Sequence, residues 1–240
     1  MKSFSMTDVG KSRQINQDFL FCSDDPIGDL PNLYIVADGM GGHNAGDYAS
    51  RFCVEVFVEH IKQSSDKTPI GKIGSALLYA NRLLIEKAAS DSNLQGMGTT
   101  FVVCTIIDNI MYVGNVGDSR LYVVNNDITQ ITEDHSLVEE MVKSGEILRD
   151  EVRFHPNKNI ITRALGANKV LVPDYFEVEI NNKDTIILCS DGLTNMIEDK
   201  EMFSVIKEYK EDLETATNVL IGKANDNGGK DNISLVIIKL

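Results

Sequence analysis

The apolar positions of this chain follow two different periods, and the two periods alternate along its length. Short apolar runs bounded by Gly, Asn or Asp predict strands, whereas apolar positions repeating every three to four residues predict helices. Strands are expected at residues 18–23, 33–38, 99–107, 110–116, 119–124, 128–131, 175–180, 185–190 and 233–239. Helices are expected at residues 45–62, 73–89, 136–144, 200–209 and 213–224, with Pro69 as an early helical residue.

Short polar breaks between strands predict how those strands pair. Asp108-Asn109 and the triplet 125–127 both read as hairpin turns, and residues 181–184 turn the next two strands. Successive hairpins give antiparallel sheets, which need helices on their apolar faces. With no break in composition, we expect a single domain, residues 1–240, of the α+β class. Residues 145–161 form a long irregular segment, which is typical of a functional flap.

Aspartates stand at or beside the ends of several apolar runs. They are Asp18, Asp38, Asp191 and Asp231, and Gly39 and Gly192 directly follow two of them. Strands ending in this way deliver carboxylates to one edge of a sheet. A like-charged pair about 4 Å apart costs roughly 4 kcal/mol even at an effective dielectric near 20, so such a cluster needs a cation. Hard oxygen ligands favour magnesium, manganese or calcium, and the number of carboxylates suggests more than one ion.

Each of these residues also has a simpler interpretation. Asp38 with Gly39 could be an ordinary turn, and Asp18 could be a solvent-facing strand start. Asp118, between Gly117 and Ser119, could cap a hairpin turn through its own side chain. Arg13 could be a surface arginine, or it could bring a planar guanidinium suited to gripping a phosphate.

Composition narrows the class of protein. The net charge of −13 argues against nucleic acid or an anionic membrane as the main partner. No run approaches the roughly 18 apolar residues of a membrane span. The four cysteines form no C-x-x-C pair and lie in or beside apolar runs, which predicts free thiols in a reducing, cytoplasmic compartment. A piece cut from a larger membrane protein would show the same pattern.

Other phosphate and metal chemistries lack their motifs. No cysteine is followed six residues later by the arginine of cysteine-nucleophile phosphatases, and Lys11-Ser12 lacks the first glycine of a P-loop, where Ser5 stands. The four histidines form no zinc motif. A site rich in Asp and poor in His favours magnesium or manganese over zinc.

Taken together, the motifs resemble those of the metal-dependent serine/threonine protein phosphatases of the protein phosphatase 2C family, in their compact bacterial form. The resemblance runs nearly end to end, and its specificity lies in the order of eight short motifs. These are TDVG with Arg13 and NQD, ADGMGGH with Gly46 and Ala49-Ser50, GTT at 98–100, NVGDSR at 115–120, TEDHS at 132–136, ITRALG at 161–166, SDGL at 190–193 and KDN at 230–232.

The family resemblance implies a fold and a set of residue roles. The fold would be a four-layer α-β-β-α sandwich of two antiparallel sheets, each flanked by a pair of antiparallel helices. Asp38 would bridge two Mn²⁺ or Mg²⁺ ions, Asp191 and Asp231 would complete one, and the Gly39 carbonyl would bind the other. Asp18 would act nearby through metal-bound water. A weaker third ion would lie between Asp118 and Asp191.

The implied reaction is hydrolysis of phosphoserine and phosphothreonine in proteins by water or hydroxide activated between the two ions, with Arg13 binding the phosphate. The catalytic residues would be Asp38, Arg13 and Asp18. Eukaryotic members carry a proposed general acid after the Asp-Gly pair, where this chain has Met40. His43 is nearby but displaced, so the acid stays unassigned.

The resemblance further implies phosphoproteins as partners, a cognate serine/threonine kinase as opponent, and a monomer. Residues 145–161 would be the flap beside the cleft. Two other functions stay open. The same site could hydrolyse small phosphate esters, or the chain could be an inactive metal-binding regulatory module.

Overall fold

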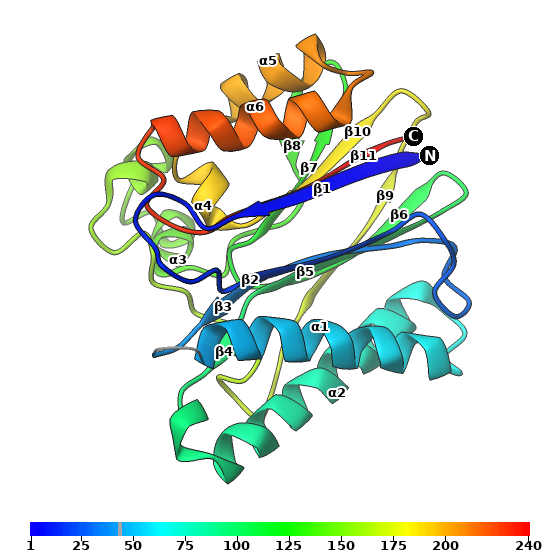
Figure 1. The fold of residues 1–240 in the computed structure, drawn as a ribbon, viewed down its shortest axis with the longest axis vertical. Helices are drawn as coiled ribbons and strands as arrows, with labels where there is room; N and C mark the ends of the chain where they lie inside the picture. The colour runs from blue at the N-terminus through cyan, green and yellow to red at the C-terminus, as the bar shows by residue number, and fades with distance from the viewer. Residues whose placement is uncertain (43–44) are drawn as a thin grey trace.

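Two antiparallel sheets form the centre of the computed structural model, which describes residues 1–42 and 45–240 (Figure 1). In spatial order, the first sheet contains β1 (Lys2–Asp8), β11 (Ile233–Lys239), β10 (Thr185–Cys189), β7 (Arg120–Val124) and β8 (Ile128–Gln130). The second contains β2 (Asp18–Ser23), β3 (Leu33–Met40), β5 (Phe101–Ile107), β6 (Ile110–Val116) and β9 (Asp174–Glu179), and β4 (Gly98–Thr99) pairs with β3. The predicted α+β class with antiparallel sheets is confirmed.

Helices cover the outer faces of both sheets, as Figure 1 shows. The second sheet packs against α1 (Ala45–Gln63) and α2 (Pro69–Ser90), through a core that includes Phe57, Leu77 and Phe101. The first sheet packs against α5 (Asp199–Glu208) and α6 (Leu213–Asp226). A third core fills the space between the sheets. The shorter helices are α3 (Leu137–Ser144), α4 (Asp191–Thr194), η1 (Ser92–Leu94) and η2 (Arg149–Phe154).

Local sequence signals explain where the helices begin and end. Thr68 caps α2, since its hydroxyl accepts a hydrogen bond from the Gly71 amide, and Pro69 occupies the first turn. Ser136 caps α3 in the same way, and Gly145 ends that helix in the left-handed conformation with φ of 78°. Gly145 is therefore also the first residue of segment 145–161, the expected flap.

The structure differs from the sequence-based elements in several places. Helix α4 was not predicted, η2 lies within the segment expected to be irregular, and the strand expected at 99–107 is divided into β4 and β5. Strand β1 was not predicted, although Phe4 and Met6 alternate with polar residues along it. Residues 181–184 do not close a hairpin, because β9 pairs with β6 whereas β10 pairs with β7 and β11. The turn at 117–119 likewise carries the chain from β6 in one sheet to β7 in the other. Turn residues reveal a reversal, but they do not reveal which sheet receives the next strand.

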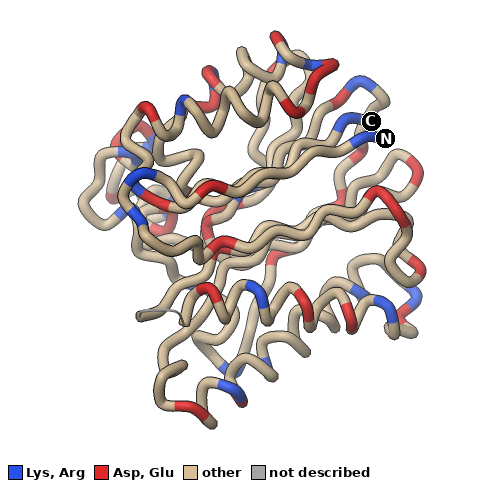
Figure 2. Tube along the Cα trace, viewed as in Figure 1, with Lys and Arg blue, Asp and Glu red and all other residues tan. Residues whose placement is uncertain are grey.

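Charged residues are distributed over the outer helices and the loops, as Figure 2 shows. Acidic positions dominate, in keeping with the net charge of −13. A few aspartates also lie at the loop ends of the central strands (Figure 2). Among residues 1–42 and 45–240, every helix is too short or too polar to cross a membrane.

Candidate metal centre

Strand pairing places the acidic residues at one edge of the two sheets. In the second sheet, Asp18 on β2 lies opposite Asp38 on β3. In the first sheet, Asp191 follows the end of β10 and Asp231 precedes β11. A hydrogen bond of 2.7 Å from the Ser190 hydroxyl to Asp18 Oδ2 joins the two sheets. Residues far apart in the chain therefore meet where the sheets approach each other.

A cleft of about 280 Å³ lies at this edge. It is lined by Arg13, Gln17, Asp38, Gly39, Met40, Gly41, Thr100, Asp118, Asn159, Ile161, Asp191 and Asp231. These include every site residue predicted from the sequence except Asp18. Asp18 lies behind the cleft, 5% exposed, with one carboxylate oxygen bonded to Ser190.

Hydrogen bonds fix the backbone of Asp38 in the cleft wall. The Asp38 amide donates to Thr100 Oγ1 (2.9 Å), and its carbonyl accepts from the Thr100 amide (2.8 Å). Gly39 has no space for a side chain, since a Cβ there would lie 2.0 Å from the Gly46 carbonyl oxygen. The Gly39 amide instead donates to the Gln17 carbonyl. The glycine is thus required by the close packing of α1 and the β1–β2 loop against the end of β3.

The loop that carries Arg13 is held by Asn232. The Asn232 side-chain amide donates to the carbonyls of Val9 (2.9 Å) and Ile15 (3.0 Å), and its oxygen accepts from the Gln17 amide (2.8 Å). Arg13 itself donates to Asp231 Oδ2 at 2.8 Å, and its side chain is 48% exposed. One edge of the guanidinium therefore contacts an acidic residue of the cleft while the group stays open to solvent.

Burial, and then like charge, raises the pKa values of Asp18, Asp38, Asp118 and Asp191. Burial is the largest cause, and it raises the pKa of Asp18 to about 7 and that of Asp191 to about 6. Burial and the neighbouring carboxylates also raise the pKa values of Asp38 and Asp118 well above the ordinary range. Without a cation, the folded protein resists placing all of these negative charges in one cleft.

Two observations fit a divalent cation in this cleft. Asp18 Oδ1 and Asp191 Oδ1 are buried, and neither finds a hydrogen-bond partner within the described chain. The donors are carboxylates and backbone carbonyls, which are the ligands that magnesium and manganese take. Among the described residues, no three acidic, histidine or cysteine side chains lie close enough together to hold a metal ion by themselves. Either protonation or a bound cation would relieve the repulsion between the carboxylates of the cleft.

Several residues that support the site were not singled out from the sequence. Ser190, Thr100, Asn195 and Asn232 each bond directly to an acidic residue of the site or to the segment beside it. Ser190 and Asn232 do stand next to Asp191 and Asp231, and that adjacency was the available signal. Thr100 lies in the GTT motif, but its contact with Asp38 depends on the fold, whereas Asn195 is only four residues from Asp191. Met40 lines the cleft as expected, whereas His43 lies outside the described residues.

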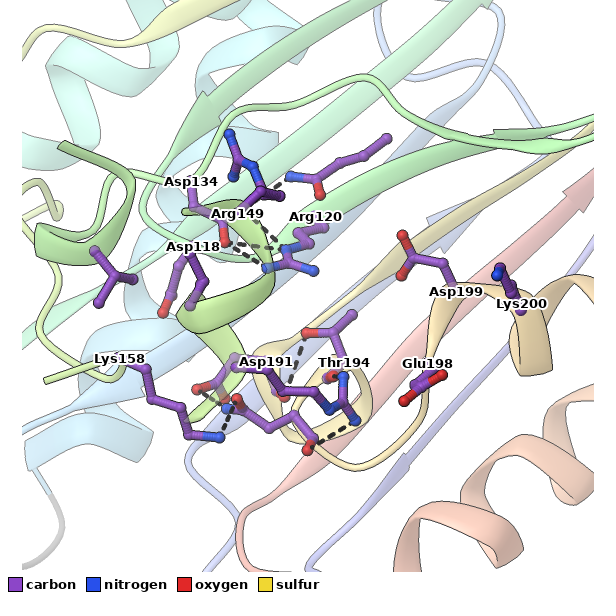
Figure 3. A pocket seen from close by; sticks show the side chains of 15 residues that line it. Asp118, Arg120, Asp134, Arg149, Lys158, Asp191, Thr194, Glu198, Asp199 and Lys200 are labelled. Atoms are coloured by element: carbon purple, nitrogen blue, oxygen red, sulfur yellow. Dashed lines mark hydrogen bonds and ion pairs between the residues drawn. The ribbon is translucent and has the colours of Figure 1, made fainter. Parts of the chain in front are cut away.

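A second cavity of about 360 Å³ adjoins the cleft and shares Asp118 and Asp191 with it (Figure 3). Its walls carry both signs of charge. Arg120 forms a bidentate ion pair with Asp134, and Arg149 pairs with Glu139 on α3. The flap, residues 145–161, supplies Arg149, Arg153 and Lys158 to this cavity.

Comparison with known proteins identifies the family. The sequence profile described as Protein phosphatase 2C matches residues 3–233. The serine/threonine phosphatase stp of Listeria innocua is 39% identical over 238 residues, which cover 97% of this chain and 93% of that protein. The chain belongs to the protein phosphatase 2C family.

Solved structures agree with this family. The crystal structure of the serine/threonine phosphatase Stp1 from Staphylococcus aureus is 32% identical, with a TM-score of 0.92 over 100% of this chain and 94% of that chain. The catalytic domain of the serine/threonine protein phosphatase PstP, in complex with two manganese ions, is 27% identical with a TM-score of 0.85. That match covers 98% of this chain and 96% of the PstP chain.

Proposed function

We propose that this chain uses the cleft at the sheet edge to hydrolyse phosphoserine and phosphothreonine in proteins. Members of its family are metal-dependent serine/threonine protein phosphatases, and this chain is one of them. The observation that carries the proposal is the shared cleft, in which Asp38, Asp191 and Asp231 lie beside Arg13.

The ligand roles implied by the family resemblance are supported by the place of these residues in one cleft wall. Asp38, Asp191, Asp231 and the Gly39 carbonyl would hold two Mn²⁺ or Mg²⁺ ions. Asp18, behind the cleft, would act indirectly. When bound, the ions supply electrostatic stabilisation and a water of lowered pKa that can attack phosphorus in line.

A weaker third ion would lie between Asp118 and Asp191. The support for this assignment is that both residues line the cleft and the adjoining cavity. Like-charge repulsion from Asp191 helps to raise the pKa of Asp118, after burial. A cation shared by the two carboxylates would relieve that repulsion.

The protein's own residues orient the phosphate. The Arg13 guanidinium is half exposed at the cleft mouth, and it can donate to equatorial phosphate oxygens, where negative charge spreads in the transition state. Asn232 holds the Arg13 loop, and Thr100 fixes the backbone of Asp38. Met40 has no proton to donate, so the leaving oxygen must receive its proton from another group.

Broader features belong to the same proposal. The apolar cores on the outer sheet faces support a four-layer α-β-β-α sandwich with an antiparallel helix pair on each sheet, as one domain over residues 1–240. The substrates would be phosphorylated proteins, and a cognate serine/threonine kinase would oppose the reaction. The phosphatase would act as a monomer. Four free thiols support a reducing, cytoplasmic location.

Phosphopeptide hydrolysis tests the proposal directly. With manganese, the protein should turn over phosphoserine and phosphothreonine peptides, and chelator should abolish this. Asp38→Ala and Asp191→Ala should each lower kcat/KM roughly a thousandfold or more. This loss corresponds to a rise of at least about 4 kcal/mol in the activation free energy. Unchanged turnover in chelator would refute the metal dependence.

Parallel assays separate the remaining alternatives. Faster turnover of small phosphate esters than of phosphopeptides would favour the small-molecule hydrolase. Manganese binding without hydrolysis of either substrate would favour the inactive regulatory module. The phosphoprotein phosphatase requires both manganese binding and a preference for phosphopeptides.

A further inference from the structure

Asn195 lies between the flap and the metal centre. It directly follows α4, whose first residue is Asp191. Its side-chain nitrogen donates to Asp191 Oδ2 at 2.8 Å, and its side-chain oxygen accepts from Lys158 Nζ at 3.1 Å. A carboxylate only accepts and an ammonium only donates, so these two partners fix which way the amide faces.

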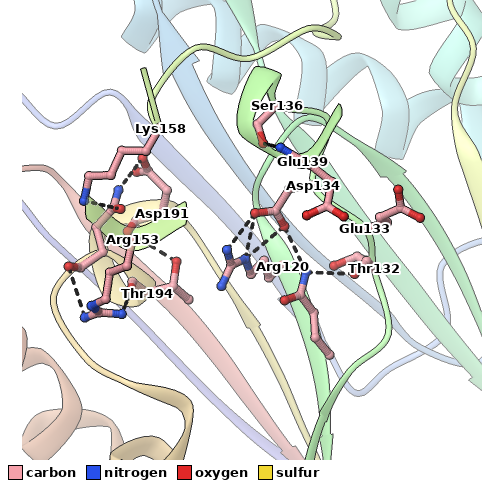
Figure 4. A network of polar contacts seen from close by, with 12 residues as sticks. Arg120, Thr132, Glu133, Asp134, Ser136, Glu139, Arg153, Lys158, Asp191 and Thr194 are labelled. Carbon is pink, nitrogen blue, oxygen red and sulfur yellow. Dashed lines mark hydrogen bonds and ion pairs between the residues drawn. The ribbon is translucent and has the colours of Figure 1, made fainter. Parts of the chain in front are cut away.

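The flap reaches α4 through a second cation. Arg153 donates to the carbonyls of Thr194 (3.1 Å) and Asn195 (3.3 Å), which are among the last carbonyls of α4. Figure 4 shows Lys158 and Arg153 gathered around Asp191 and Thr194, apart from the Arg120–Asp134 pair. Arg153 therefore contacts both α4 and Asn195, whereas Lys158 contacts Asn195.

The other side of the flap is attached to α3. Arg149 pairs with Glu139, and the Ile160 carbonyl accepts from the Leu137 amide at 2.8 Å. The flap thus spans the second cavity from α3 to α4. Asn195 links it to Asp191 through hydrogen bonds, and the Lys158 charge also acts on the Asp191 carboxylate directly. Because Asn195 occupies Asp191 Oδ2, the buried and unpartnered Asp191 Oδ1 is left for a cation.

We propose that Asn195 is a positioning residue that couples the flap to the metal centre. With the flap docked, Lys158 and Arg153 hold Asn195, and Asn195 orients the Asp191 carboxylate toward its cation. Groups that orient metal ligands typically change metal affinity about 10- to 100-fold when removed. The inference rests on the proposed function for the ligand role of Asp191, and it adds a structural route by which flap docking changes metal affinity.

Calorimetric titration of the chelator-treated protein with manganese measures this coupling without relying on turnover. Asn195→Ala should weaken manganese binding roughly tenfold, and Lys158→Ala should weaken it by a smaller factor. In the double variant, the loss should be smaller than the sum of the two single losses, because part of the effect of Lys158 passes through Asn195. The matched controls are Asn218→Ala and Lys207→Ala, on the exposed faces of α6 and α5, and both should bind manganese as the wild type does.

Hydrogen exchange of residues 145–161 gives a readout that a purely structural role would leave unchanged. Manganese should slow exchange of the flap in the wild type, and this effect should vanish in Asn195→Ala. Unchanged manganese affinity in both Asn195→Ala and Lys158→Ala, or strictly additive losses, would overturn the coupling. If Asn195→Ala fails to fold, Lys158→Ala on the flap still decides between these outcomes. Failure of the wild type to bind manganese would instead refute the proposed function.

Discussion

At the scale of single residues, the acidic side chains differ in what surrounds them. Asp18 is buried and bonded to Ser190, whereas Asp231 is partly exposed and paired with Arg13. One residue type therefore takes several roles in one cleft, because each copy has its own neighbours. Burial and neighbouring charges make these aspartates differ, and the amino-acid type alone reveals neither.

Arg13→Ala tests the phosphate-binding role. We expect KM for a phosphopeptide to rise about tenfold while kcat falls less, because the guanidinium binds phosphate in the ground state as well as in the transition state. Lys11→Ala, in the same loop and exposed beside Asp226, is the control and should leave both constants near wild type. A collapse of kcat at constant KM would place Arg13 in the chemical step instead.

At the scale of elements, the site depends on loops that are held by strands of the opposite sheet. Residues 9–17 join β1 of the first sheet to β2 of the second, and Asn232 at the start of β11 fixes this connection. The turn at Gly117, with φ of 106°, likewise crosses between the sheets next to Thr100. A left-handed backbone and close packing leave room only for glycine there.

Asn232→Ala tests whether the Arg13 loop is held as described. The side chain is 3% exposed and makes three hydrogen bonds to backbone groups, so its loss should lower the free energy of unfolding by about 3 kcal/mol. It should also raise KM, because Arg13 loses its position. Denaturant unfolding and peptide kinetics measure the two effects. Asn218→Ala, an exposed helix asparagine, should change neither, and equal effects from both variants would contradict the role.

At the scale of the whole molecule, the buried carboxylates at the sheet edge make stability depend on pH. The folded-state pKa values of Asp18 and Asp191 are about 7 and about 6, both raised from 3.8. Between these folded values and 3.8, the folded protein binds more protons than the unfolded chain. The stability of the metal-free protein must therefore fall as pH rises from about 4 to 7. Burial lowers the pKa of His135, which opposes this trend because its folded form favours the neutral ring.

Thermal unfolding in chelator between pH 5 and 8 measures this dependence. We expect the melting temperature of the metal-free protein to fall toward pH 8, and manganese to raise it most at the alkaline end, where the carboxylates are ionised. Asp18→Asn should flatten the dependence, since an amide does not titrate. A metal-free melting temperature that rises steadily with pH would show that folding does not raise the pKa values of these carboxylates.

The sequence by itself determined the family, most strand and helix positions, and the aspartates of the site. Those features depend on local periodicity and on short motifs such as Asp38-Gly39 and Asp191-Gly192. Both can be recognised in the sequence without the tertiary structure. It did not predict β1, whose place is decided by pairing with β11 at the other end of the chain. Nor did it predict the roles of Ser190 and Asn232, because those roles are contacts with residues 172 and 223 positions away. Only the packing of one sheet against the other brings such partners within hydrogen-bond distance, and the electrostatics of the cleft depend on that same approach.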